Sequence, residues 1–155
     1  EGACDEILRA MIETNHTQTP GYGLDAHCEQ AAELIRKACG TRKADVHFLV
    51  GGTQCNKTLI AAALRPHEAV ICADTGHINV HETGAVENSG HKVIALRADD
   101  GKVRCADIEQ AVKKHTDEHM VKPKMVYLSN ATELGTFYTK QELSDIWKQF
   151  RLQAQ

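Results

Sequence analysis

Two glycines and two hydrogen-bonding side chains occur where an apolar run gives way to a helical pattern. They form the segment Gly51-Gly52-Thr53-Gln54. Glycine lets a ligand approach the backbone closely, and the free N–H groups at the start of a helix attract an anion. The segment therefore predicts an anion site, although a tight turn with a threonine cap would have the same sequence. It contains neither GxGxxG nor GxxxxGK(S/T), so the common nucleotide-binding motifs are absent.

A second polar segment, residues 74–84, follows another apolar run and carries two histidines and an acid. His77 and His81 are four residues apart, and Glu82 comes next. This spacing fits two ligands on one helical turn, but the order is not HExxH, so we predict no metal site. A capped turn of helix with solvated histidines is one alternative. Another is an imidazole that lies flat on the aromatic ring of a cofactor.

The segments that must position these residues are short apolar runs alternating with helical patterns. The runs that predict strands are residues 46–50, 69–73, 91–96 and 125–129. The helical patterns that follow them cover residues 53–64, 105–115 and 140–152. Such alternation implies right-handed crossovers and a mostly parallel sheet with helices on both faces. The predicted fold is a three-layer α/β/α domain, in which ligands bind beyond the carboxyl ends of the strands.

Two further helical patterns precede the first predicted strand. They cover residues 5–14 and 26–38, the second with Asp25 as its cap and Gly40 after its end. We therefore expect residues 1–44 to form an N-terminal helical arm. Residues 45–155 would form a single α/β domain, since 155 residues with 42% hydrophobic content can bury one core.

Composition excludes several classes of partner. The net charge of -3 is spread along the chain, so we expect no nucleic-acid surface. No apolar stretch approaches the roughly 20 residues that span a bilayer, and the acidic first residues do not resemble a signal peptide. Six cysteines without a CxxC pair favour reduced thiols, and we expect no membrane association and a cytoplasmic location.

Five segments occur in the order and with the spacing of one enzyme family. They are residues 20–23, 45–54, 74–78, 81–84 and 130–135. Together they resemble the low-specificity threonine aldolase and β-eliminating lyase family, whose members are fold type I enzymes that use pyridoxal 5'-phosphate. The resemblance runs from Glu1 to about Ile146 and implies that residues 45–155 are part of the large, cofactor-binding domain of that fold.

The resemblance implies roles for individual residues. Gly52, Thr53 and Gln54 would bind the cofactor phosphate through backbone N–H groups and the threonine hydroxyl. His77 would stack on the pyridine ring, and Glu82 would lie close to the ring and the substrate.

Two other positions concern the substrate and the partner subunit. Glu133, within Thr132-Glu133, is a third candidate catalytic residue and stands where many threonine aldolases have a histidine near the reacting hydroxyl. The preferred amino acid, and the choice between aldol cleavage and β-elimination, therefore stay open. Tyr22 would lie near the active site at the interface of a homodimer or homotetramer.

Two groups that pyridoxal chemistry requires are absent from the matched segments. They are the lysine that forms a Schiff base with the cofactor and the acid that keeps the pyridine nitrogen protonated. In the family both follow the portion matched here. We therefore expect the complete protein to cleave β-hydroxy amino acids to glycine and an aldehyde, and this chain alone to be inactive. The alternative is a non-catalytic, truncated subunit that binds or dimerises with a complete one.

Overall fold

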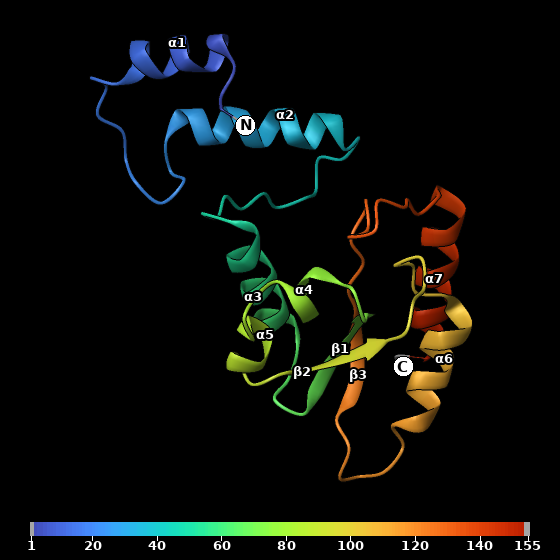
Figure 1. Cartoon of the computed structure of the whole chain (residues 1–155). Coiled ribbons are helices and arrows are strands. Elements are labelled where there is room, and N and C mark those ends of the chain that lie inside the picture. Colours follow the sequence, from blue (N-terminus) through green and yellow to red (C-terminus); the bar gives the residue numbers. More distant parts are fainter. Residues whose placement is uncertain (1, 154–155) are drawn as a thin grey trace. The chain divides into compact units, whose positions relative to one another are not determined.

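The structure is a computed structural model that describes residues 2–153, and it divides into two compact units (Figure 1). The N-terminal unit, Glu1–Leu49, contains the helices α1 (Asp5–Thr14) and α2 (Ala26–Ala38). The Asp25 carboxylate accepts a hydrogen bond from the Cys28 N–H at 2.9 Å and so caps α2. Gly40 follows the end of α2 with φ of 65°. The bounds that the sequence predicts for both helices, and the cap and stop that it predicts for α2, are confirmed.

The strand predicted at residues 46–50 is wrong. The segment has no regular secondary structure and bends at Val50, and Phe48, Leu49 and Val50 are 48%, 41% and 97% exposed. A strand needs a neighbour that pairs with its N–H and C=O groups, and no described strand pairs with this segment. An apolar run by itself does not distinguish a paired strand from an unpaired segment.

The C-terminal unit, Val50–Gln155, is built on a three-stranded sheet in the order β2-β1-β3. The strands are β1 (Glu68–Ala73), β2 (Lys92–Leu96) and β3 (Lys122–Val126), and both pairs are parallel. The first two match the predicted strands, whereas β3 begins and ends three residues earlier than predicted. Pro123 lacks an N–H group, which hid this start in the sequence, but β3 tolerates it as an edge strand of the described sheet.

Helices cover both faces of the sheet (Figure 1). One face carries α3 (Gly52–Ala63), α4 (His77–Val80) and α5 (Ala85–Asn88), and the other carries α6 (Cys105–Lys114) and α7 (Lys140–Gln153). The short helix α5 was not predicted, because four residues are too few for a helical period. The predicted three-layer α/β/α arrangement with a parallel sheet is confirmed.

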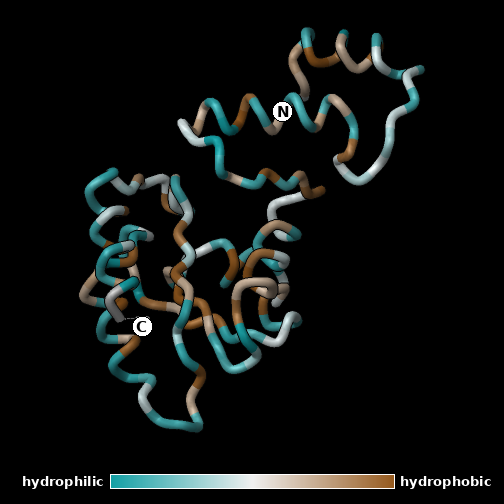
Figure 2. Tube along the Cα trace, turned by 180° about the vertical axis from the view of Figure 1, so that it is seen from behind, coloured by the Kyte–Doolittle hydropathy of each residue, from teal (hydrophilic) through white to brown (hydrophobic). Residues whose placement is uncertain are grey.

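Alternation along β1 divides the core into two apolar clusters. Ala69, Ile71 and Ala73 pack with residues of α6 and α7, whereas Val70 and Cys72 pack with residues of α3, α4 and α5. Successive side chains of a strand point to opposite faces, so one buried strand serves both layers. Figure 2 shows hydrophobic residues concentrated along the strands of this unit and hydrophilic residues on its outer helices.

The cysteines form no disulfide bond within the described part of the chain. All six are free thiols, and Cys72 is fully buried in β1. Burial, with a smaller effect from the Glu87 and Asp74 carboxylates, raises the pKa of the Cys72 thiol to about 12. Cys72 therefore stays protonated and behaves as a small apolar residue. Among residues 2–153, no helix combines the length and apolar composition needed to cross a bilayer.

The first prediction concerns the cluster between α3 and the sheet. Ile60 is 1% exposed and its neighbour Leu59 is 65% exposed, on the same helix. Ile60→Ala should lower the free energy of unfolding by about 2–5 kcal/mol, because it leaves a cavity. Leu59→Ala should change it by less than about 0.5 kcal/mol. Urea unfolding of the chain measures both, and equal effects would contradict the packing described here.

A second prediction concerns the start of α7. Thr139 and Glu142 form a capping box, in which Glu142 accepts from the Thr139 N–H at 2.7 Å and its own N–H donates to the Thr139 hydroxyl at 3.2 Å. The Lys102 ammonium and the bonds from Thr139 lower the pKa of Glu142 from 4.5 to about 2. A carboxyl group whose pKa is lower in the folded state than in the unfolded state stabilises the fold at pH values above its unfolded-state pKa. That stabilisation is lost as the pH falls through the folded-state pKa.

The measurement is the melting temperature of wild type and Glu142→Gln between pH 2 and pH 6. The wild type should be more stable above pH 4.5, and the difference should vanish as pH falls to about 2. Glu118→Gln, at an exposed position, is the matched control. A wild-type advantage that grows on acidification would contradict the sign of the effect.

Candidate functional site

The start of α3 presents free backbone donors to open space. Gly51 is the N-cap in an extended conformation and makes no side-chain cap. The first helical hydrogen bond runs from the Cys55 N–H to the Gly51 carbonyl at 3.0 Å, so the N–H groups of Gly52, Thr53 and Gln54 have no acceptor within the helix. A Cβ built on Gly51 or Gly52 would meet no atom within 4 Å. An anion can therefore reach these donors and the positive end of the helix dipole.

The side chain of Gln54 has a structural task in this turn. Its Oε1 accepts a hydrogen bond from the Val50 N–H at 3.0 Å, which closes the turn ahead of α3. The backbone N–H of Gln54 is free to bind an anion, while its side-chain oxygen is engaged by Val50. The Thr53 side chain is exposed at the first turn of the helix.

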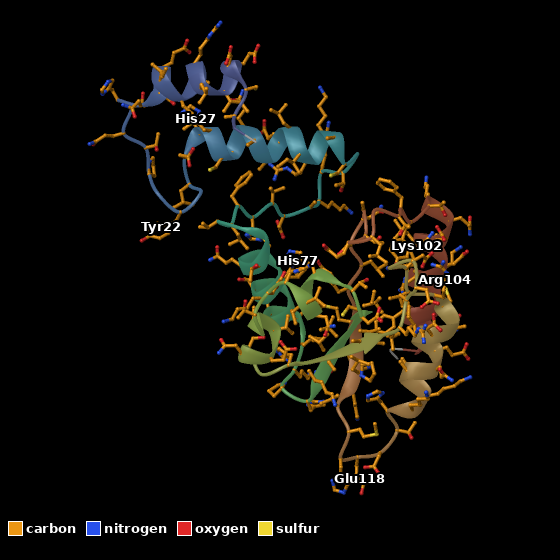
Figure 3. The ribbon with its side chains drawn as sticks, in the orientation of Figure 1. Tyr22, His27, His77, Lys102, Arg104 and Glu118 are labelled. Carbon is orange, nitrogen blue, oxygen red and sulfur yellow. The ribbon has the colours of Figure 1, made fainter. Side chains whose placement is uncertain are left out.

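The turn after β1 places His77 at the carboxyl end of this central strand. Gly76 makes the turn tight, since a Cβ on it would lie 2.9 Å from the Ala73 carbonyl oxygen. His77 then opens α4, and its Nδ1 lies 2.8 Å from Oε1 of Glu82. A carboxylate oxygen accepts hydrogen bonds, so this contact favours the His77 tautomer that carries a proton on Nδ1. The imidazole is thus held at one nitrogen while 37% of the side chain stays exposed (Figure 3).

Glu82 is a buried acid that joins His77 and Asn56 in one hydrogen-bonded cluster. Its side chain is 0% exposed, and Oε1 accepts from His77 and from Nδ2 of Asn56, the latter at 2.6 Å. Its other oxygen, Oε2, is buried without a hydrogen-bond partner among the described residues. A buried carboxylate oxygen requires a donor or costs stability. The site therefore has an unused acceptor beside the His77 ring.

Two further residues of this cluster, Asn56 and Tyr127, were not predicted from the sequence. The Asn56 Nδ2 group donates to Glu82 and also to the Tyr127 hydroxyl, at 3.4 Å. Asn56 comes three residues after Thr53, so both lie on one face of α3. That spacing places Asn56 beside the predicted anion site, but it does not reveal that the partner of Asn56 is Glu82. For Tyr127, which directly follows β3, the sequence carries no signal.

Glu133 belongs to a neighbouring cleft at the carboxyl ends of β1 and β3. The cleft is small, with a volume of about 10 Å³ that can hold about one water molecule, and its lining includes Glu133, Gly76, Tyr127, Thr75 and Ser129. The hydroxyls of Thr75 and Ser129 are buried without partners among the described residues. Tyr127 joins this cleft to the Asn56 and Glu82 cluster. Glu133 itself is exposed, so its carboxylate is accessible.

The loop that carries Glu133 is fixed by its neighbours. The Thr132 and Thr136 hydroxyls lie 2.8 Å apart, and the Thr136 hydroxyl donates to the Asp100 carbonyl at 2.7 Å. Gly101 must be a glycine here, because its φ is 78° and a Cβ would lie 2.9 Å from the Thr132 hydroxyl. The turn after β2 thus holds the loop after β3.

Tyr22 lies in the N-terminal unit. Its φ is 63° and its side chain is fully exposed, pointing away from α1 and α2 (Figure 3). A positive φ is uncommon for a bulky residue and costs free energy. Its role at a subunit interface stays a prediction.

The two histidines do not form a metal centre with other ligands in the described part of the chain. The rings of His77 and His81 have centroids 5.6 Å apart at an angle of 57°. Residues 2–153 contain no group of three or more His, Cys, Asp or Glu side chains that could hold a metal ion. His77 is engaged by Glu82 instead.

Comparison with known proteins gives consistent matches over nearly the whole chain. Two curated relatives are low specificity L-threonine aldolases from a Pseudomonas species and from Pseudomonas aeruginosa, 34% and 35% identical over 94% of this chain. The solved structure of a Leishmania major threonine aldolase matches 99% of the chain with 51% identity and a TM-score of 0.97. The chain spans 42% of each curated relative and 45% of the Leishmania chain.

The match to the Leishmania structure extends the fold assignment from a general α/β class to fold type I of the pyridoxal-phosphate enzymes. The model of the β-eliminating lyase family matches residues 2–151. The family to which the sequence segments pointed is thereby confirmed: the chain belongs to the β-eliminating lyases.

Proposed function

We propose that this chain is the N-terminal part of a pyridoxal-phosphate-dependent lyase that cleaves β-hydroxy amino acids, such as threonine, to glycine and an aldehyde. Members of the family depend on pyridoxal phosphate, and the relatives named above are threonine aldolases. One observation carries the proposal: the open donors at the start of α3 lie one helical turn from Asn56, which is linked through Glu82 to His77. A phosphate site and a ring-binding imidazole are thus parts of one cluster.

The residues present fit the phosphate of the cofactor. Three backbone N–H groups without helical acceptors face space that no side chain fills at Gly51 and Gly52. The helix dipole adds a favourable interaction with a negative group. In the proposal, Gly52, Thr53 and Gln54 donate their N–H groups, and the Thr53 hydroxyl adds a fourth donor.

The residues also fit the ring. Nδ1 of His77 is held by Glu82, which fixes the plane of an imidazole whose side chain is partly exposed, as stacking on a pyridine ring requires. Pyridoxal phosphate, when bound, supplies a ring that withdraws electrons from the bonds of an amino acid. The chain's own residues orient that ring. Glu82 keeps an acceptor, Oε2, for a donor that arrives with the ligand.

Other parts of the proposal concern the complete protein. We propose that Glu133 contacts the substrate hydroxyl and that Tyr22 contributes to a neighbouring subunit's site in a homodimer or homotetramer. The lysine and the acid that the cofactor chemistry needs would come from the portion of the family's chains beyond the match. The 155 residues alone would then be inactive.

The function is tested by product release. The complete protein with added pyridoxal phosphate should convert L-threonine to glycine and acetaldehyde. A coupled enzymatic reduction of the acetaldehyde measures the release of this product. The 155-residue chain under the same conditions should release neither product. Absence of both products from the complete protein, across several β-hydroxy amino acids, would refute the proposed reaction.

The phosphate site is tested by a matched pair of substitutions on α3. Thr53→Val should weaken pyridoxal phosphate binding about 10- to 100-fold, because a hydrogen bond to a charged group contributes about 1.5–3 kcal/mol. Thr58→Val, at an exposed position of the same helix, should leave affinity unchanged. Titration followed by cofactor fluorescence measures both. Equal affinities would place the phosphate elsewhere.

A further inference from the structure

We propose that Asn56 is a positioning residue, which acts through Glu82 to hold the His77 imidazole in one tautomer and one orientation. The significance of this arrangement for catalysis rests on the function proposed above. The hydrogen-bonded chain from Asn56 to His77 can be tested without it.

The geometry begins with the buried carboxylate. Glu82 is fully buried, and a single oxygen receives both His77 Nδ1 at 2.8 Å and Asn56 Nδ2 at 2.6 Å. Bonds to an ionised group are stronger than bonds between neutral groups, so these two contacts set the orientation of the carboxylate. In the neutral tautomer that carries its proton on Nδ1, Nε2 is left as an acceptor.

Asn56 is the partner that fixes Glu82 from outside its own segment. His77 and Glu82 are five residues apart in the same turn-rich stretch, whereas Asn56 comes from α3 and is 26 residues away from Glu82. Without Asn56, the carboxylate would be oriented only by the ring that it is meant to orient. The amide of Asn56 therefore fixes the orientation of the Glu82 carboxylate independently of His77.

Both N–H groups of the Asn56 amide have an acceptor. One lies toward Glu82 and the other toward the Tyr127 hydroxyl, at 2.6 Å and 3.4 Å. An amide nitrogen has two hydrogens, so this set uses its whole donor capacity. The shorter bond, to Glu82, contributes more to the orientation of the carboxylate, and the longer bond, to Tyr127, limits the rotation of the Asn56 amide.

The position of Asn56 on α3 gives the arrangement its consequence for the site. Thr53 and Asn56 lie on one face of a single helix, so one rigid element sets both the phosphate donors and the brace of Glu82. The distance between the phosphate and the stacking ring is then fixed by the helix. Active-site groups must be held to about 0.5 Å for efficient catalysis.

The tautomer of His77 is the direct readout. Long-range ¹H–¹⁵N NMR spectra of the 155-residue chain distinguish a proton on Nδ1 from one on Nε2, and loss of one signal in His77→Asn assigns the peak. The wild type should show a single form of neutral His77 with the proton on Nδ1. Asn56→Ala should produce a mixture in which the Nε2-protonated form rises at least severalfold. Asn88→Ala, which removes an exposed asparagine that pairs with Lys57, should match the wild type.

The outcomes are decisive. An unchanged His77 tautomer in folded Asn56→Ala would overturn the proposal, and if that variant is unfolded by circular dichroism, Asn56→Leu, which keeps the approximate volume and has no donor, gives the same test. In the complete protein, Asn56→Ala should lower kcat for threonine cleavage about 10- to 100-fold with little change in KM. If the wild-type complete protein neither binds pyridoxal phosphate nor cleaves threonine, the proposed function fails, while a tautomer shift would still support the role of Asn56 toward His77.

Discussion

The site depends on the burial of one carboxylate. Glu82 has a fully buried side chain, and such a group is tolerated only where donors satisfy it. Its donors come from His77 after β1 and from Asn56 on α3, and Asn56 in turn contacts Tyr127 after β3. Three segments far apart in the sequence are therefore held in register by the requirement that one acid be paired.

The parallel sheet makes this convergence possible. Parallel strands end at the same edge, so the turns after β1 and β3 emerge side by side, and the first of them delivers His77. Close packing at that edge requires two glycines, Gly76 and Gly101, because a Cβ on either would lie 2.9 Å from a neighbouring atom. The side chains of β1 pack into apolar clusters on both faces of the sheet. This burial of apolar surface stabilises the unit that carries the polar cluster.

Much of the fold could be predicted from local sequence because its signals are local. Asp25 as a cap, Gly40 as a stop and the apolar stripes of α1, α2 and α7 each identify a helix without reference to the rest of the chain. The error at residues 46–50 has the opposite cause, because pairing depends on a partner strand that no local pattern can reveal. The open helix start at Gly51-Gly52-Thr53 could likewise be predicted, and the polar segment that contains His77 and Glu82 was apparent from the sequence, whereas the binding of an anion there stays a prediction. The role of Asn56 could not be predicted, since its partner lies 26 residues away and a single polar residue in a helix has no periodic signal.

In the proposed function, the start of α3 and the cluster of His77, Glu82 and Asn56 form one pyridoxal phosphate site. A crystal structure of the complete protein with the cofactor bound tests it most directly. We expect phosphate oxygens about 2.7–3.2 Å from the backbone nitrogens of Gly52 and Thr53, with the His77 ring stacked on the pyridine ring. A phosphate bound away from α3, or a His77 ring turned away from the cofactor, would contradict it.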